Sequence, residues 1–372
     1  MQLSDNNTQA FLALVKSGLL GKKVQLSQYG SIDFNVIFRL AEEQSVVGLV
    51  AAGIEHIVDV KIPREVVLQF VGSALQLEQR NLAMNQFIAC LIENLRSAGI
   101  YAILLKGQEV AQCYERPLWR SCGDVDLFLS DTNYEKAKKV LTSIASTVEA
   151  EYVREKHLGM TINDWVVELH GRLYCGLSSR IERELDDVLH DTFYGGAVRS
   201  WDNSGVQIFL LSAENDAFYV FTHILQHFYK EGVGLRQICD WCRLLWTNRD
   251  NLDVNKLESY IRKSGLLSEW KAFAAYAVEF LGMPTEAMPL YSSSKKWKRK
   301  ALLINKFILQ VGNMGHNRDM SYFNKPYVIR KTISLKRRIG DLINHARIFP
   351  LDSLRFLPSI LFNGLQSAVK GE

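Results

Sequence analysis

Proline and low-complexity segments are scarce in this chain of 372 residues. It has seven prolines and no Gly/Ser-rich or Pro-rich stretch, which excludes a collagen-like, mucin-like or linker-dominated protein. Hydrophobic residues make up 48% of the chain and charged residues 23%, a composition that supports a folded protein with a substantial core. The length allows two or three domains.

Long apolar runs are also missing, as is the basic start of a signal peptide. The most apolar stretch, 46–58, is interrupted by Glu55 and His56 and falls short of the roughly 20 residues needed to cross a bilayer. The first twenty residues carry acid and amide side chains where a signal peptide has basic ones. Six scattered cysteines lack the spacing of a disulfide scaffold. We therefore expect a cytoplasmic protein without a membrane span.

Acidic residues are scarce in the last fifth of the chain. Residues 295–372 carry sixteen Lys/Arg against four Asp/Glu, a net charge of +12, whereas the first 294 residues carry −8. The basic clusters are interleaved or followed by the aromatic residues Tyr322, Phe323 and Tyr327. This pattern fits RNA, whose phosphates attract the charge and whose bases stack on rings. An anionic membrane surface, met by the apolar segment 351–369, or a solvated basic face over a nucleotide cleft explains it as well.

Apolar spacing divides the chain into four regions and predicts an α+β fold, with a small mixed sheet flanked by helical N-terminal and C-terminal regions. The first region is expected to end in a long helix, from Pro63 to Ala98, stopped by Gly99. The regions are a helical part at 1–98, an α/β core at 99–211, a helical domain at 212–290 and a basic C-terminal region at 291–372.

The predicted core contains short apolar runs that read as strands, separated by segments with helical spacing. Ser130 and Asp131 are in place to cap the second of these helices. The expected strands are 101–105, 125–129, 165–169 and 206–211, and the expected helices are 108–114 and 131–145.

The strand expected at 125–129 carries a pair of acids that point to metal chemistry. Strand alternation places Asp124 and Asp126 on one face, while Val125 and Leu127 point into the core. Two adjacent carboxylates repel one another unless a divalent cation lies between them, and oxygen ligands suit Mg²⁺ or Mn²⁺. Glu168, on a later strand, can complete a cluster of three carboxylates able to hold two ions.

Two segments near these acids predict phosphate contacts. Lys106 and Gly107 lie where a strand turns into a helix, so backbone N–H groups and an ammonium can meet a phosphate there. Arg120 precedes the acid pair and is a second phosphate candidate, although it can equally pair with Asp124.

In this order, the motifs Leu-Leu-Lys-Gly, Arg-Ser-Cys-Gly-Asp-Val-Asp-Leu-Phe and Val-Glu-Leu-His resemble the nucleotidyltransferase (polymerase beta-like) superfamily, and its bacterial branch of uncharacterised nucleotidyltransferases. The resemblance covers about residues 100–172. It implies that Asp124, Asp126 and Glu168 bind metal and that Gly107 lies beside the triphosphate. It further implies transfer of an NMP group from an NTP, ATP in the first place, to a hydroxyl acceptor. The superfamily usually has Ser or Gly after that glycine, where this chain has Gln108.

Other readings of the same residues remain open. A glycosyltransferase also uses Asp-x-Asp to bind a metal and a nucleotide diphosphate, but there the motif follows a hydrophobic strand, whereas Asp124 begins one. A catalytically degenerate scaffold that binds a nucleotide or polyanion is a different class of protein. Lys106 alone is explained by a surface lysine at a strand end.

Three pairs in the helical domain invite a site interpretation. His223 and His227 have zinc-compatible spacing without a Glu partner, so a helix face lining the cleft or the core is favoured. The cysteines at 239 and 242 lack a second pair, which favours core packing. Arg236 and Asp240 are spaced for an ion pair along one helix and can reach the nucleotide or the acceptor if that helix faces the cleft.

Overall fold

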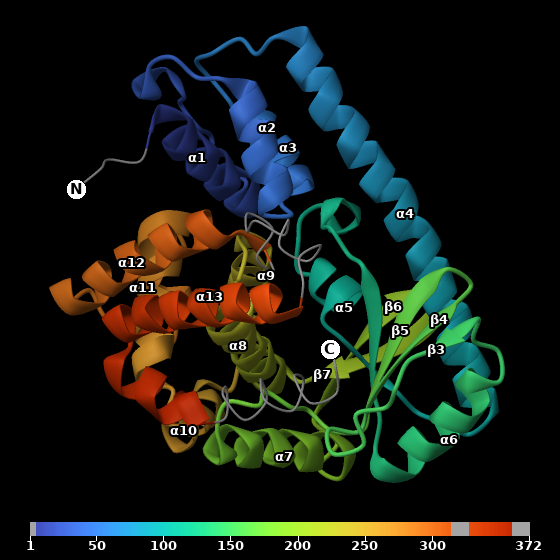
Figure 1. The fold of residues 1–372 in the computed structure, drawn as a ribbon. Coiled ribbons are helices and arrows are strands. Elements are labelled where there is room, and N and C mark those ends of the chain that lie inside the picture. The colour runs from blue at the N-terminus through green and yellow to red at the C-terminus, as the bar shows by residue number, and fades with distance from the viewer. Residues whose placement is uncertain (1–4, 314–326, 359–372) are drawn as a thin grey trace.

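Helices at both ends of the chain surround one seven-stranded mixed sheet, as the computed structural model of residues 5–313 and 327–358 shows (Figure 1). The predicted α+β fold class is confirmed. The amino-terminal helices are α1 (Asn6–Leu20), α2 (Phe34–Glu43), α3 (Val47–Ile54) and α4 (Arg64–Ser97). The strands are β1 (Ile103–Leu105), β2 (Asp124–Phe128), β3 (Thr147–Val148), β4 (His157–Ile162), β5 (Trp165–His170), β6 (Val198–Asn203) and β7 (Val206–Leu211). Between the strands lie α5 (Gly107–Ala111), α6 (Asp131–Thr142) and α7 (Ser179–Phe193). The carboxyl-terminal helices are α8 (Ala213–Lys230), α9 (Leu235–Asn248), α10 (Val254–Ser264), α11 (Leu267–Leu281), α12 (Lys295–Val311) and α13 (Tyr327–Ile348).

All four strands expected from the sequence are present, although the first begins at Ile103 rather than at residue 101. Sequence reasoning missed β3, β4 and β6. Strands β3 and β6 are the outer strands of the sheet, and β3 has two exposed residues, so neither shows a clean apolar alternation. In β4 a histidine and a glycine interrupt the pattern.

The sheet order is β3-β4-β5-β2-β1-β7-β6, which places β2 at its centre. Strand β2 pairs parallel with β5 and antiparallel with β1, and β1 pairs parallel with β7. The motif-bearing strands therefore lie side by side although about 40 residues separate β2 from β5.

Each face of the sheet contributes to a different hydrophobic core. Val125 and Leu127 of β2 pack with the second half of α4 and with α6 in a smaller core. Phe128, on the opposite face, belongs to a larger core shared by the amino-terminal helices and the carboxyl-terminal helical domain. The acids of β2 therefore lie on the face that looks toward the helical domain.

The long helix α4 joins the two cores. Val66 and Phe70 in its first half pack into the larger core, whereas Ile88 and Leu95 in its second half pack into the smaller one. Figure 1 shows α4 running along the outside of the molecule from α2 and α3 to the sheet. One continuous helix thus ties the amino-terminal helices to the sheet.

Glycines allow the amino-terminal helices to approach their neighbours closely. A Cβ atom at Gly18 of α1 would lie 2.0 Å from the Leu49 carbonyl oxygen of α3, and one at Gly48 would lie 2.0 Å from the Trp119 carbonyl oxygen. No side chain fits at either position. Helix α3 is therefore held directly against α1 and against the segment that precedes β2.

None of the helices in the described part of the chain combines the length and the apolar character needed to cross a bilayer.

Candidate active site

The three acids expected to bind metal lie together on the central strands. Asp124 and Asp126 of β2 share a face, and Asp126 lies directly opposite Glu168 of β5 in the parallel register. Neighbouring strands are about 4.8 Å apart, so these two carboxylates are neighbours across the ladder. The structure therefore brings Asp124, Asp126 and Glu168 into one acidic cluster.

Lys106 is turned into this cluster. Its ammonium Nζ lies 2.9 Å from Asp126 Oδ1, and its side chain is largely buried. Burial by itself lowers the pKa of Lys106, but the field of Asp126, aided by Tyr219 and Glu168, outweighs it and holds the pKa above the usual value. The alternative of a surface lysine at a strand end is therefore excluded.

A strained turn directs Lys106 toward Asp126. Lys106 precedes α5 with φ +50° and ψ −147°, and Gly107 follows with φ +44°. A positive φ is costly for a lysine, about 1–3 kcal/mol, and is tolerated only where the surroundings enforce it. A Cβ on Gly107 would approach Cys122 Sγ to 3.0 Å, so position 107 needs glycine for both its backbone angles and its space.

Two histidines complete the contacts of the acids. His170 Nε2 lies 2.7 Å from Asp126 Oδ1 and 3.6 Å from Glu168 Oε2, while His157 Nε2 lies 3.1 Å from Glu168 Oε2. Burial raises the pKa of Asp126, but Lys106 and His170 overcome this and hold that pKa well below the usual range. Asp126 is therefore ionised throughout the physiological range.

Asp124 differs from its neighbours. Its carboxylate makes no hydrogen bond or ion pair with any residue in the described part of the chain. Burial, followed by the charge of Asp126, raises its pKa. A divalent cation beside Asp124 would relieve both effects. An unpartnered, largely buried carboxylate of this kind suits a metal ion.

The donor atoms indicate which metals suit the cluster. The oxygens of Asp124, Asp126 and Glu168 suit Mg²⁺ or Mn²⁺. Ligand atoms of His157, Glu168 and His170 lie within 4.8 Å of one another, which adds imidazole nitrogens that Mg²⁺ does not prefer. The carboxylates suit the predicted Mg²⁺ or Mn²⁺ by their chemistry, whereas the ligand atoms that the described residues bring within reach of one ion are those of His157, Glu168 and His170.

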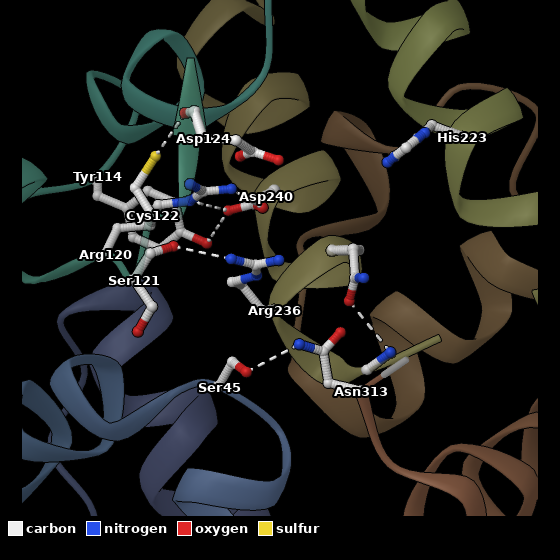
Figure 2. A network of polar contacts seen from close by, with 12 residues as sticks. Ser45, Tyr114, Arg120, Ser121, Cys122, Asp124, His223, Arg236, Asp240 and Asn313 are labelled. Atoms are coloured by element: carbon white, nitrogen blue, oxygen red, sulfur yellow. Dashed lines mark hydrogen bonds and ion pairs between the residues drawn. The ribbon is translucent and has the colours of Figure 1, made fainter. Parts of the chain in front are cut away.

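Arg120 does not join the acids. Its Nη2 lies 2.6 Å from Asp240 Oδ2 and its Nε 3.1 Å from Asp240 Oδ1, a bidentate pair to which the Tyr114 hydroxyl adds a hydrogen bond (Figure 2). The alternative pairing of Arg120 with Asp124 is wrong, because helix α9 supplies a better acid. Arg120 therefore braces the segment before β2 against α9.

The expected ion pair between Arg236 and Asp240 is also wrong. Asp240 is occupied by Arg120, and Arg236 instead donates from Nη1 to the Ser121 carbonyl oxygen, at 3.0 Å (Figure 2). The helical spacing was compatible with a pair, but Arg120, from another segment, donates two hydrogen bonds to the Asp240 carboxylate.

Helix α8 brings Tyr219 and His223 near Lys106, and of these two only Tyr219 was not predicted from the sequence. Lys106 Nζ lies 5.9 Å from the centre of the Tyr219 ring, and His223 lies one turn further along and 3.0 Å, between Nε2 atoms, from His227. Burial, then the charges of Lys106 and His227, holds the pKa of His223 well below its usual value. The spacing of residues 219, 223 and 227 was the available signal. Of the two locations expected for His223, the cleft or the core, the charge of nearby Lys106 favours the cleft.

His157 gave no such signal, because its strand β4 was not predicted. The expectation for Cys239 and Cys242 is confirmed, since both are fully buried in the core.

The basic cluster at 295–300 forms the start of α12, where several of its members make contacts within the fold. Lys298 Nζ lies 2.7 Å from Glu279 Oε1, and Lys300 Nζ lies 3.2 Å from Ser268 Oγ and 4.4 Å from the centre of the Phe349 ring. Tyr322, Phe323 and residues 359–369, which entered the RNA and membrane interpretations, lie outside the described residues, as does the side chain of Tyr327.

Comparison with known protein families identifies one family. The family described as "Uncharacterised nucleotidyltransferase" matches residues 30–282, which is more than half of the chain. The chain therefore belongs to this family. Neither the curated proteins nor the solved structures gave a match.

Proposed function

From family membership and the acidic cluster, we propose that this nucleotidyltransferase moves an NMP group from an NTP to a hydroxyl acceptor with release of pyrophosphate, in a reaction that depends on Mg²⁺ or Mn²⁺. ATP is the expected donor. The observation that carries the proposal is the unpartnered Asp124 carboxylate beside Asp126 and Glu168.

In this proposal the three carboxylates have different tasks. Asp124, Asp126 and Glu168 hold the metal, which when bound neutralises charge on the phosphates and activates the acceptor hydroxyl. Asp126 is held in place by Lys106 and His170, so it presents its carboxylate in a fixed orientation. A carboxylate held in a fixed orientation can hold the metal, and so the reactants, in the geometry that the reaction needs.

Glu168 is also the proposed acceptor of a proton. The acceptor oxygen attacks the α-phosphorus, the bond from that phosphorus to the bridging oxygen of pyrophosphate breaks, and the hydroxyl proton moves to Glu168. His157 lies 3.1 Å from Glu168 Oε2 and is part-exposed, so it can pass the proton to solvent. Glu168 and His157 together thus supply a route for the proton.

Lys106 and Gly107 are proposed to steady the phosphates. The Lys106 ammonium already lies at the cluster, and Gly107 leaves the adjoining turn free of side-chain atoms. Arg120 retains this predicted role only if the Asp240 pair opens, so it contributes least to the proposal.

The test is a thermal-shift titration of the wild-type chain and Asp126→Asn with each of the four NTPs, with and without Mg²⁺. A ligand at 100 times its Kd stabilises the folded state by about 2.7 kcal/mol. We expect a shift for the wild-type chain only with metal and nucleotide together, and none for Asp126→Asn.

Asp131→Asn is the matched control, because Asp131 pairs with Lys156 at 2.9 Å, the same distance as Asp126 with Lys106, but at the surface. It should keep the wild-type shift. Equal stabilisation of Asp126→Asn would refute the site. No shift with any NTP would favour the degenerate scaffold, and a shift with a sugar nucleotide alone would favour the glycosyltransferase.

We further propose that the basic carboxyl-terminal region meets a polyanion, either RNA or an anionic membrane surface. Neutralising Lys295, Lys296 and Arg299, which leaves the Lys298 and Lys300 contacts intact, should weaken binding to RNA or to anionic vesicles and flatten its salt dependence. If the salt dependence of binding is unchanged, the basic residues form a solvated face that does not bind the polyanion.

A further inference from the structure

A pocket of about 670 Å³, the part open to solvent included, lies between the amino-terminal helices and the segment that leads into β2. Val46, Leu49 and Ala52 give it an apolar wall, and Trp119 adds an aromatic one. Because glycines fix α3 against α1 and Trp119, the wall is part of the packed structure.

Arg236 of α9 lines this pocket and brings a positive charge that has no ion-pair partner within the described residues. Only one of its five N–H groups makes a hydrogen bond within the described residues, the bond to the Ser121 carbonyl oxygen. Its Nε is buried without a partner, and no carboxylate there forms an ion pair with it. Burial, then the nearby charge of Arg120, lowers the pKa of Arg236. The Arg236 guanidinium therefore lacks an anionic partner.

The other charges at the pocket are accounted for. Arg116 pairs with Glu55 through Nη1 and Oε1 at 2.8 Å, and Arg120 pairs with Asp240. Glu115 is exposed to solvent, so water screens its charge. Arg236 is thus the cation at the pocket whose charge is neither paired nor fully solvated.

Arg236 also links the pocket to the segment that leads into β2. Arg236 holds Ser121, three residues before Asp124, and the charges of Arg236 and Asp124 act on each other's pKa. Figure 2 shows Arg236 lying between the Arg120–Asp240 pair and the amino-terminal helices. A molecule bound at Arg236 therefore lies next to the strand that carries the metal ligands.

We propose that this pocket binds the acceptor substrate, and that the acceptor is a small molecule with an apolar body and an anionic group, a carboxylate or a phosphate, that pairs with Arg236. A planar guanidinium with free N–H groups recognises either anion through two parallel hydrogen bonds. This inference rests on the proposed function, because it supplies the acceptor for the same reaction.

The test uses phenyl phosphate and benzoate as probes, with phenol as their neutral counterpart, and measures binding by calorimetry. Phenyl phosphate, benzoate or both should bind the wild-type chain, and the stronger binder names the anion. Arg236→Gln should weaken that binding about tenfold or more, because a charge-assisted hydrogen bond is lost. Binding of phenol should be the same in both.

Two further variants isolate the role of Arg236. Arg172→Gln removes a charge of the same type from the Asp186 pair elsewhere, and it should bind the probes as the wild-type chain does. If Arg236→Gln does not fold, Arg236→Lys carries the test. It keeps the charge but loses the planar fork, so it should bind the anion about threefold or more weakly.

Unchanged anion binding in the Arg236 variant that folds, or no saturable binding of either probe to the wild-type chain, would overturn the inference. Asp126→Asn separates it from the proposed function, since this variant should lose NTP binding and keep probe binding. If Asp126→Asn weakens the probes as much as Arg236→Gln does, the anion site belongs to the donor phosphates and the inference falls. Arg236-dependent probe binding by a chain that binds no NTP would overturn the proposed function and leave the anion site.

Discussion

Two ionic clusters in the described part of this molecule each hold more acids than fixed cations, but their surroundings differ. In the first, Asp126 and Glu168 meet Lys106 and His170 beside the unpartnered Asp124. In the second, Arg199 of β6 binds Glu109 of α5 at 2.9 Å and Asp216 of α8 at 2.6 Å. In each cluster the carboxylates outnumber the Lys or Arg side chains that pair with them.

Burial explains the difference. Glu109 and Asp216 are each 1% exposed, so the second cluster has no carboxylate open to solvent. In the first cluster Asp126 is buried as deeply, but its neighbour Glu168 is not. Burial, then Asp216, raises the pKa of Glu109 well above its usual value, which favours a proton shared between the two acids. Glu168 is 28% exposed in its side chain, so the first cluster can accept a hydrated cation. Similar residues thus form a closed structural cluster in one place and, in the other, a cluster open enough for the proposed metal ion.

The largest effect that tests this comparison is expected for Arg199→Gln. Removing one partner of a buried pair leaves charge uncompensated and costs about 3–5 kcal/mol. Chemical denaturation should show this loss, whereas Arg172→Gln, which breaks the exposed pair with Asp186, should cost about 0–1 kcal/mol. Equal costs would show that the second cluster is not sealed.

Lys106→Met tests the open cluster, and this substitution should strengthen metal binding rather than weaken the protein. The ammonium competes with a divalent cation for Asp126, so its removal should raise the affinity for Mn²⁺ without nucleotide about tenfold, by about 1.4 kcal/mol. Titration of Mn²⁺ by electron paramagnetic resonance measures this. Lys156→Met, at the surface pair with Asp131, should leave the affinity unchanged. A lower affinity in Lys106→Met would mean that the lysine organises the metal site rather than competing with it.

The pH dependence of stability should report on the helix that lines the open cluster. The pKa of His223 is held well below its usual value, so below about pH 6.5 the unfolded chain binds a proton that the folded chain does not. Stability should therefore fall as the pH drops below about 6.5, and this residue contributes up to about 1.4 kcal/mol per pH unit. His223→Gln should flatten the curve, while His190→Gln, exposed on α7, should not. Identical curves for His223→Gln and the wild-type chain would contradict the burial of a neutral His223.

Glu109→Gln should have the smallest effect. The glutamine amide donates a hydrogen bond to Asp216 as a protonated Glu109 does, so the free energy of unfolding should change by less than about 1 kcal/mol. Asp126→Asn, the same chemical change in the open cluster, should remove metal-dependent NTP binding. A cost for Glu109→Gln comparable to that of Arg199→Gln would show that Glu109 is ionised and that the proton assignment is wrong.

Local pattern predicted the elements that carry strong periodicity. The long helix α4, the central strands and the placement of Asp124 and Asp126 on one face follow from the alternation of side chains along the chain. Strands β3 and β6 lie at the edges of the sheet, where one side of the ladder is unpaired. Most of their residues are exposed or half-buried, so their pattern was too weak to predict them.

The sequence by itself determined the α+β fold class and the identity of the three acids, because strand alternation and the order of the motifs are local properties. Tertiary structure alone decided which partners they meet. In the folded chain Asp240 pairs with Arg120 rather than with Arg236, and His157 contacts Glu168. Arg236 lies at a pocket. These pairings depend on which side chains from distant segments reach the same buried charge. Residue spacing along the chain does not contain that information.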